Sequence, residues 1–384
     1  MTQDRAPVLS SLTGIRFIAA IFVFNAHANN LPGGPDVLDG VGLAGHDWMT
    51  MFFILSGLVL TWNYDEVLGR RRDAHGIRVY LVARFARIYP LYLLVLIVVA
   101  LSTVRLPSDV LDLVRDPSLW ASVFAVQTWS GDLSVAYGYN GPGWSVGVEL
   151  FLYALFPLLI IPFQRIRSNP RALVVVATVS VALTFAFVVV AFLMGTADLP
   201  REDPWSAHRW LYRTPLTRVP DFVLGMAIGY LLTHTRGRDL SGPGRVLQAV
   251  GGITVMGLMF VPVLPFTIWS LDAANTIPFA LLMLGLVWAP GTRLSRFLST
   301  PPMVLLGDSS YAFYLWHQAI VRFVAGEEVA VSTTAWAVTW ILAFLLTTLV
   351  AIGSHLAVEL PARTLLRRRL SGQGAPPIAA IEPK

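Results

Sequence analysis

The sequence predicts an all-α fold: a polytopic membrane bundle of about ten transmembrane helices with both termini in the cytoplasm. Three observations predict it. The chain of 384 residues is 55% hydrophobic and only 13% charged, roughly half the charge of a typical soluble domain. Several apolar runs approach or exceed the ~20 residues that cross a bilayer as a helix. Arginines gather on alternate connectors between these runs, as the positive-inside rule requires.

Ten apolar stretches are candidates for these spans. With the N-terminus inside, most arginines lie in cytoplasmic connectors, and adding or losing one span would spoil this asymmetry. The outer connectors hold only Arg105, Arg115, Arg201, Arg209, Arg213 and Arg218. The predicted spans cover residues 11–29, 47–64, 87–104, 144–163, 172–194, 219–234, 246–265, 275–290, 303–325 and 333–357.

The connectors and the two ends complete the predicted organisation. Residues 118–129 are apolar but too short to span, so we expect a re-entrant or surface helix outside. The outer connectors 105–143 and 195–218 are the longest and are expected to cap a cavity. Residues 1–370 are predicted to form one integral-membrane domain, and residues 371–384 a disordered cytoplasmic tail. Arg16 and Asn25 argue against a cleaved signal peptide.

The composition also excludes several functions. Cysteine is absent, so disulfides, a thiolate nucleophile and Cys-ligated metals are ruled out. No cluster of ligand residues of metal type is apparent, and no metal site is expected. The net charge of +5 is too small to imply a nucleic-acid partner. The predicted location is the cell (inner) membrane, as a multi-pass protein in contact with the lipid bilayer.

Arg16 and His27 are the ionisable residues of the first span. Eleven positions separate them, which is three helical turns plus about 20°, so both side chains leave one face of the helix. They lie roughly 16 Å apart along the axis. Taken alone, Arg16 would be interpreted as a snorkelling arginine at the membrane interface, and His27 as a structural histidine. Ionisable groups in membrane helices usually face the bundle interior or a wet cavity. The shared face of Arg16 and His27 therefore indicates that this side of the helix lines a functional site.

Glu149 and Ser145 lie one turn apart near the outer end of the fourth span, just after Trp144. Glu149 is about 7 Å inside the span, at a depth similar to that of His27. A carboxylate near an imidazole can orient it and stabilise its protonated form, so this pair would suit removal of a proton from a hydroxyl. The alternative is a structural ion pair between Glu149 and an outer arginine such as Arg218.

Arg84 and Arg87 are neighbours on a helical surface on the predicted cytoplasmic side, and Tyr89 follows them. Arginine forks suit phosphate oxygens, so we expect this pair to hold a phosphate-bearing ligand. The preceding Arg70, Arg71 and Arg72 are explained equally well by the positive-inside rule alone.

Two further spans carry polar or small residues within apolar runs. In the second span, Phe53 is followed by Ser56 and Gly57, which permit close helix approach. In the ninth span, polar side chains such as Asp308 and His317 within an apolar run suggest a cavity wall, although His317 could equally be a core histidine. The residues expected to line the cavity are Phe53, Ser56, Tyr89, Trp144, Ser145, Asp308, Tyr311, Tyr314 and His317.

Taken together, these segments resemble the acyltransferase-3 family of integral-membrane O-acyltransferases. The motifs are Arg-x10-His in the first span, Phe-Phe-x-Leu-Ser-Gly in the second, Arg-x-x-Arg-Ile-Tyr-Pro before the third, Trp-Ser-x-x-x-Glu in the fourth and Ser-Tyr-x-x-Tyr-Leu-x-His in the ninth. Glu359-Leu360-Pro361 matches the Glu-x-Pro that closes such domains. Each motif is weak alone, but their order over residues 11–361 is specific. We expect the chain to differ from one branch of the family, in which a soluble esterase-like domain follows the last helix.

The resemblance implies transfer of a short acyl group, acetyl foremost, to a hydroxyl that is usually on a sugar. The donor is expected to be acetyl-CoA or a related acyl-CoA, which acts as a co-substrate, with no cofactor permanently bound. His27 matches the histidine regarded as catalytic in the family, and Arg16, Arg84 and Arg87 match the basic residues regarded as donor-binding. Direct transfer and an acyl-histidine intermediate are both open.

Several readings of the acceptor and of the activity remain open at this point. A polysaccharide, a lipid-linked sugar or a macrolide-like metabolite fits as the sugar-containing acceptor, and a lipid or a protein is the alternative. A proton-coupled secondary transporter, with His27, Glu149 and His317 as a relay, is the rival from another class. The sequence lacks the repeats or paired broken helices that would favour a transporter.

Overall fold

The computed structural model describes residues 9–28, 34, 45–70, 74–259, 273–326 and 332–371. Within these ranges the chain is helical and contains no strand, so the all-α class is confirmed. Arg71, Arg72 and nearly all of the predicted tail, residues 372–384, lie outside the described residues.

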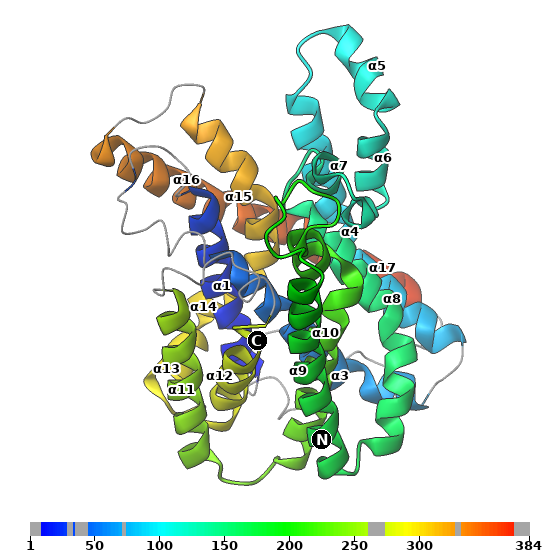
Figure 1. The fold of residues 1–384 in the computed structure, drawn as a ribbon, viewed down its shortest axis with the longest axis vertical. Helices are drawn as coiled ribbons and strands as arrows, with labels where there is room; N and C mark the ends of the chain where they lie inside the picture. The colour runs from blue at the N-terminus through cyan, green and yellow to red at the C-terminus, as the bar shows by residue number, and fades with distance from the viewer. Residues whose placement is uncertain are drawn as a thin grey trace.

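A described helix overlaps every one of the ten predicted spans (Figure 1). The long helices are α1 (Ser10–Ala28), α3 (Trp48–Arg70), α4 (Ala74–Ser102), α8 (Gly143–Ile166), α9 (Pro170–Leu193), α10 (Val219–His234), α11 (Ser241–Met259), α12 (Thr276–Trp288), α15 (Ser310–Ala325), α16 (Thr333–Ser354) and α17 (Leu360–Ser371).

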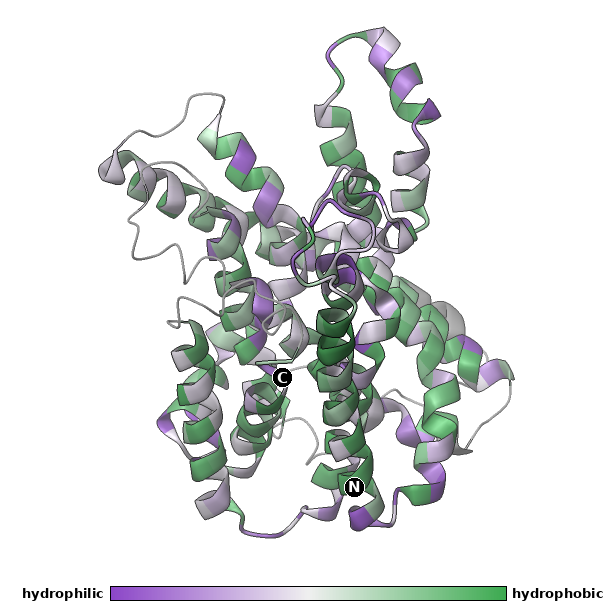
Figure 2. Cartoon of the chain, viewed as in Figure 1, coloured by the Kyte–Doolittle hydropathy of each residue, from purple (hydrophilic) through white to green (hydrophobic). Residues whose placement is uncertain are grey.

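The membrane character is carried by five helices that are long and apolar enough to cross a bilayer. They are Ser10–Ala28, Ala74–Ser102, Gly143–Ile166, Pro170–Leu193 and the continuous stretch Thr333–Leu365. Figure 2 shows apolar residues along most of the length of these helices. The chain is therefore a membrane protein, whereas the count of ten spans and the cytoplasmic placement of both termini stay predictions.

The long outer connectors fold into short helices rather than extended loops. Residues 105–143 form α5 (Pro107–Arg115), α6 (Pro117–Val123), η4 (Gln127–Trp129) and α7 (Leu133–Tyr137). Helix α5 lies at the tip of this connector, and α6 packs against α4 (Figure 1). The apolar segment 118–129 is thus two short helices, not one. The connector 195–218 contains a π-helical turn, η5 (His208–Arg213), and a short helix, η6 (Pro215–Arg218).

Three predicted spans differ from the observed helices. Helix α4 begins at Ala74, whereas the predicted span begins at residue 87, so Arg84 and Arg87 lie well inside the helix rather than at its start. The first turns of α4 are polar, and hydropathy alone cannot detect them. The ninth span is broken at Ser309 into α14 (Pro301–Asp308) and α15. The tenth passes through a π-helical turn, η7 (His355–Glu359), before continuing as α17.

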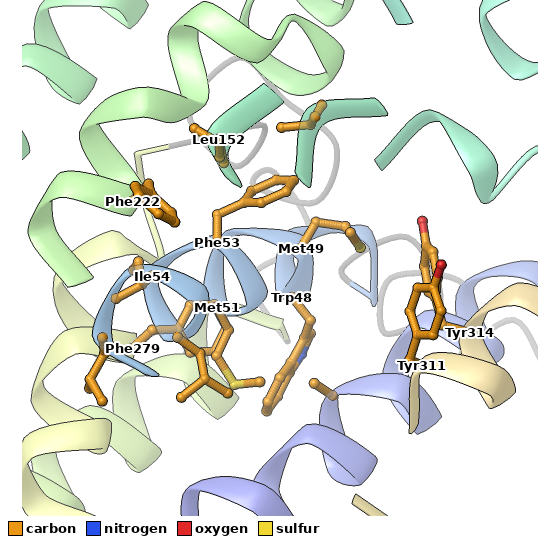
Figure 3. Close-up of a cluster of buried hydrophobic side chains, with 14 of the residues drawn as sticks. Trp48, Met49, Met51, Phe53, Ile54, Leu152, Phe222, Phe279, Tyr311 and Tyr314 are labelled. Atoms are coloured by element: carbon orange, nitrogen blue, oxygen red, sulfur yellow. The ribbon is translucent and has the colours of Figure 1, made fainter. Parts of the chain in front are cut away.

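Helix α3 packs closely against α10 through two reciprocal glycines. A Cβ added at Gly57 would overlap the backbone oxygen of Phe222, and one added at Gly225 would overlap that of Ile54. The expectation that small residues in the second span permit close approach is confirmed at Gly57. Around this crossing, side chains of α3 interlock with Phe222 of α10, Phe279 of α12 and Leu152 of α8 (Figure 3).

Candidate active site

A cavity of about 810 Å³, its open mouth included, lies between α1, α3, α4, α8 and α15. Its wall combines three arginines and a glutamate with hydroxyl groups and apolar side chains, a mixture suited to a ligand with anionic and apolar parts. Its lining residues are Arg16, Met49, Phe52, Phe53, Leu55, Ser56, Val59, Leu60, Arg84, Arg87, Ile88, Ser145, Glu149, Tyr153, Ser310, Tyr311 and Tyr314.

All three predicted donor-binding arginines line this cavity. Arg84 and Arg87 are one turn apart on α4, and Arg16 approaches from α1 within electrostatic range of Arg87. Arg84 donates a hydrogen bond from Nη2 to the Tyr64 hydroxyl at 2.7 Å, with its guanidinium 4.9 Å from that ring centroid. Its buried Nε has no partner among the described residues. The three cations therefore share one space with few fixed partners.

Glu149 belongs to the same cavity. Its Oε1 accepts hydrogen bonds from the Tyr153 hydroxyl and, at 3.4 Å, from the Ser56 hydroxyl. Its charge also acts on Arg16. The structure records no contact between Glu149 and His27 within the described ranges, because similar depth on two helices does not make their side chains face each other. Arg218, the alternative partner considered for Glu149, pairs with Asp221 instead.

His27 lies in a separate group of rings, the histidine cluster, which consists of His27, His46 and His317. The ring centroid of His27 is 5.0 Å from that of His46 and 4.9 Å from that of His317. His27 is absent from the cavity wall, but Tyr314 connects the two regions. It lines the cavity and its ring centroid is 5.6 Å from that of His317.

The other residues expected to line the cavity divide into two sets. Phe53, Ser56, Ser145, Tyr311 and Tyr314 are in the wall. Tyr89, Trp144, Asp308 and His317 are not among the wall residues. Tyr89 donates a hydrogen bond to the Val123 backbone oxygen at 2.7 Å, and Trp144 packs on Tyr212 with ring centroids 4.6 Å apart. Asp308 acts electrostatically on Arg16, and His317 belongs to the histidine cluster.

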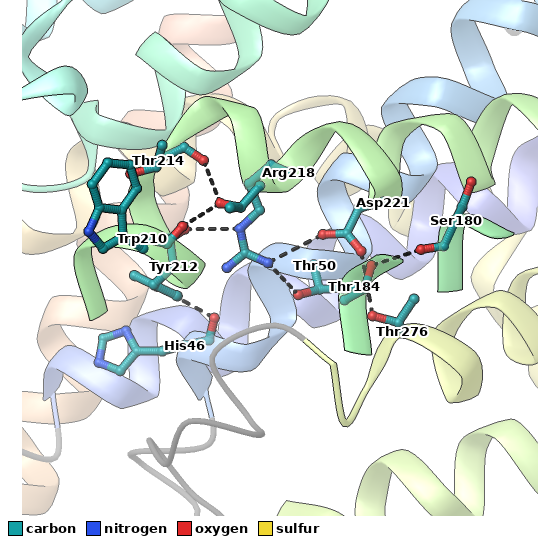
Figure 4. A network of polar contacts seen from close by, with 11 residues as sticks. His46, Thr50, Ser180, Thr184, Trp210, Tyr212, Thr214, Arg218, Asp221 and Thr276 are labelled. Atoms are coloured by element: carbon teal, nitrogen blue, oxygen red, sulfur yellow. Dashed lines mark hydrogen bonds and ion pairs between the residues drawn. The ribbon is translucent and has the colours of Figure 1, made fainter. Parts of the chain in front are cut away.

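An ion pair not singled out in the sequence supports both regions. Arg218 and Asp221 form a fully buried pair, with Nη1 to Oδ2 at 3.3 Å. Arg218 also donates to the Tyr212 backbone oxygen at 2.9 Å and to the Thr50 hydroxyl at 3.2 Å (Figure 4). Its guanidinium lies 5.6 Å from the ring centroids of both Phe53 and Tyr212. The sequence feature that could have revealed this pair is an arginine and an aspartate three positions apart at the start of an apolar run.

His46 and Tyr212 are further residues that the sequence did not mark. Both come from connectors: His46 from η3 (Gly45–Asp47) and Tyr212 from η5. The Tyr212 hydroxyl donates to the His46 backbone oxygen at 3.5 Å. Burial lowers the pKa of His46 well below its ordinary value, and the neighbouring His27 adds to the effect. At neutral pH, His46 is therefore an uncharged neighbour of His27.

His208 shares this outer region. Its ring lies 5.4 Å from that of Tyr212, and its Nε2 is 3.2 Å from the Tyr137 hydroxyl. Burial, followed by the charges of Arg213 and Arg201, lowers the pKa of His208 to about 4. In the described part of the chain, no group of three or more His, Cys, Asp or Glu side chains is arranged to hold a metal ion.

Comparison with known proteins places this geometry in context. The chain is similar to acyltransferase MdmB of Streptomyces mycarofaciens, with 31% identity over 396 residues that cover 97% of this chain and 96% of the relative. It is also similar to the exopolysaccharide production protein ExoZ of Rhizobium meliloti, with 31% identity covering 85% of this chain and 90% of the relative.

A third relative is larger. The peptidoglycan O-acetyltransferase OatA of Listeria monocytogenes is 23% identical over 83% of this chain, but the match covers 50% of that protein. No solved structure matches the chain significantly. The acyltransferase domain of the acyltransferase-3 family matches residues 9–356. This match decides between the enzyme and transporter readings: the chain belongs to the acyltransferase-3 family and is an O-acyltransferase of the membrane.

Proposed function

We propose that this protein transfers a short acyl group, acetyl foremost, from acyl-CoA to a hydroxyl of a carbohydrate or a glycosylated metabolite. It acts as a multi-pass protein of the cell (inner) membrane. The observation that carries the proposal is the cavity in which Arg16, Arg84 and Arg87 meet, joined through Tyr314 to the histidine cluster. One region suits an anionic donor and the other suits proton transfer.

The donor part of the proposal rests on charge. Acyl-CoA carries its phosphates at one end and its thioester at the far end of a flexible arm. One guanidinium group can donate two parallel hydrogen bonds to the oxygens of a phosphate, and the ammonium group of Lys cannot reproduce this geometry. Arg84 and Arg87 hold the phosphates, and the arm passes along the Arg16 face of α1 towards His27. The distance to be covered is roughly 16 Å.

The chemical part assigns the base to His27. Its unprotonated nitrogen takes the proton from the acceptor hydroxyl while the oxygen attacks the thioester carbonyl. The tetrahedral intermediate then expels the CoA thiolate, which receives that proton from His27. The products are the ester and free CoA, and His27 is restored. The same ring can instead act as a nucleophile: it attacks the thioester carbonyl and expels the CoA thiolate. The acceptor hydroxyl then attacks the acyl-histidine, which restores the ring, and the hydroxyl proton passes to the thiolate.

Glu149 acts in the donor cavity rather than on His27 in this proposal. Its carboxylate, held by Tyr153 and Ser56, offsets the charge of Arg16 before the donor binds. A cavity holding three uncompensated cations in a membrane helix bundle would be costly. Glu149 therefore lowers the cost of the empty site at some expense in affinity for the anionic donor.

The acceptor part draws on the relatives. The names of two of them refer to peptidoglycan O-acetylation and to exopolysaccharide production, and peptidoglycan and exopolysaccharide are both carbohydrate-containing polymers. A polysaccharide, a lipid-linked sugar and a macrolide-like metabolite are the candidate acceptors of this class.

The proposal is tested with extracts and with purified protein. Mass spectrometry of extracts from cells with and without the gene should find a sugar-containing compound that gains an acyl group only when the gene is present. The purified protein in lipid nanodiscs should release CoA from acetyl-CoA when that compound is added, and His27→Gln should not. An acylated lipid or protein with an unmodified glycan fraction would replace the proposed acceptor.

A further inference from the structure

His317 is the most enclosed member of the histidine cluster. Its side chain is 1% exposed and projects from α15 beside α1. Its ring plane is tilted 42° from that of His27, with centroids 4.9 Å apart. Two imidazoles at this separation can bring a nitrogen of one within hydrogen-bond distance of a nitrogen of the other. The position of the proton on His317 therefore matters for His27.

A backbone hydrogen bond fixes that proton. Nδ1 of His317 lies 2.5 Å from the Tyr314 backbone oxygen. A carbonyl oxygen only accepts, so Nδ1 is the donor and carries a hydrogen. No described carboxylate pairs with this ring, and a charge buried without a counter-charge is costly. The ring is thus neutral, and Nε2 presents a bare lone pair.

The lone pair on Nε2 is buried and has no hydrogen-bond partner within the described ranges. An unsatisfied buried acceptor costs roughly 1–3 kcal/mol, which favours a conformation in which a neighbouring donor satisfies it. His27 is such a neighbour, because one of its two ring nitrogens carries a hydrogen when the ring is neutral. A small rotation of the His27 ring would point that N–H at Nε2 of His317.

We propose that His317 is the positioning residue for His27. Its Nε2 accepts a hydrogen bond from His27 and so holds His27 in one tautomer, with the lone pair on the opposite nitrogen. That lone pair faces the acceptor hydroxyl, and the bond persists when His27 becomes protonated. The inference rests on the proposed role of His27 as base. It gives His317 the orienting part that the sequence had suggested for Glu149.

The chain offers a matched control in His46. This ring also contacts His27, with centroids 5.0 Å apart, but it comes from η3 and stands edge-on at 83°. Replacing either residue with Phe keeps an aromatic ring in place and removes both nitrogens. The two variants therefore separate a hydrogen bond at Nε2 of His317 from simple packing around His27.

The decisive measurement is the ¹⁵N NMR spectrum of the histidine rings in detergent-purified full-length protein, at a pH at which His27 is neutral. The chain has 7 histidines, and the His27 signals are those lost in His27→Gln. We expect one His27 tautomer in the unsubstituted protein and in His46→Phe, and a mixture in His317→Phe. A single tautomer that persists in His317→Phe, or that is lost only in His46→Phe, overturns the proposal.

Kinetics provide a second readout. His317→Phe should lower kcat by about 10–100-fold, the scale known for residues that orient metal-ligating histidines, with KM for acyl-CoA unchanged. His317→Gln should recover part of kcat, because its amide oxygen can accept the same bond. If kcat falls equally in His317→Phe and His317→Gln and the His27 tautomer is unchanged, His317 has a purely structural role. Full turnover in His27→Gln would defeat the proposed function, while the tautomer measurement would still test the contact.

Discussion

Arg218, which is fully buried, and Arg84, which is half-buried, lie close to the same cavity but have different surroundings. Arg218 is fully enclosed and meets Asp221, Thr50 and the Tyr212 backbone oxygen, with aromatic rings on two sides. Arg84 has one hydrogen bond, to the Tyr64 hydroxyl, and a buried Nε without a partner among the described residues. The first arrangement satisfies the cation within the protein, and the second leaves capacity for a ligand.

Arginine therefore serves two purposes in one helix bundle. Buried polar groups are normally satisfied, so a cation with spare donors next to a cavity indicates a binding site, whereas a saturated cation indicates support. The Arg218 network, which comprises Arg218, Asp221, Thr50 and Tyr212, should therefore control stability. The arginines Arg16, Arg84 and Arg87 should control donor affinity.

The largest effect is expected for Arg218→Met. Removing one partner of a buried ion pair leaves an uncompensated charge and costs about 3–5 kcal/mol. The variant should unfold at a clearly lower temperature in a thermal melt of the detergent-purified protein, and Arg218→Met/Asp221→Leu should recover part of the loss. Arg167→Met is the control, because its pair with Asp65 is half exposed on the arginine side and worth only ~0–1 kcal/mol. Equal melting temperatures for both single variants would remove the distinction.

A pH effect of up to about 3 kcal/mol is expected from His208, beside the Arg218 network. Its folded pKa of about 4 is below the ordinary value of 6.5, so the unfolded chain binds the proton first. His208 therefore contributes stability above pH ~6.5 that is lost as pH falls towards ~4. The difference in unfolding free energy between the unsubstituted protein and His208→Gln should shrink over this window. A constant difference would show that His208 titrates normally.

For the donor arginines, Arg84→Ala and Arg87→Ala should each weaken acyl-CoA binding without a matching loss of stability. A charge-assisted hydrogen bond contributes about 1.5–3 kcal/mol, so KM for acyl-CoA should rise by roughly 10–100-fold. Lys should restore only part of it. Arg78→Ala, an exposed arginine on the same helix, is the matched control and should leave KM unchanged. Unaltered donor affinity in the double Ala variant would make both arginines topology signals only.

The smallest effect is expected for Glu149→Gln. The substitution keeps the hydrogen bonds to Ser56 and Tyr153 but removes a negative charge from an anion-binding cavity. Donor affinity should rise by roughly fivefold, about 1 kcal/mol, and kcat should fall by less than in His27→Ala. A fall in kcat at constant KM would instead support an orienting role for Glu149 towards His27. Titration with a non-hydrolysable acyl-CoA analogue measures the affinity directly.

The sequence located the helices well because apolar runs of membrane length are a strong signal. It misplaced the start of α4, since Ala74 to Arg87 mixes polar and apolar residues and carries no hydropathy signal. It also missed the break at Ser309 between α14 and α15, which hydropathy cannot detect. Where a run begins in a polar helix or changes helix type, a one-dimensional pattern does not contain the boundary.

The site shows the same limit. The sequence indicated Arg16, Arg84 and Arg87 as donor-binding residues, and in the structure all three line one cavity. Charged residues inside apolar helices usually face the bundle interior or a wet cavity. It placed Glu149 beside His27 on depth alone, but depth does not fix the direction a side chain takes around its helix. His46 and Tyr212 lie on connectors, where no periodicity marks which residues turn inwards.

In the proposed mechanism, donor binding and proton transfer occupy adjacent but distinct places in the bundle. This separation is tested most directly by measuring, on one preparation of His27→Gln, both the Kd for acetyl-CoA and the single-turnover rate of acyl transfer. Gln keeps hydrogen-bonding capacity but cannot act as a base near neutral pH. We expect a Kd close to that of the unsubstituted protein and a rate lower by about 10²–10⁴-fold. A rate near that of the unsubstituted protein, or a rate loss fully explained by weaker acetyl-CoA binding, would contradict it.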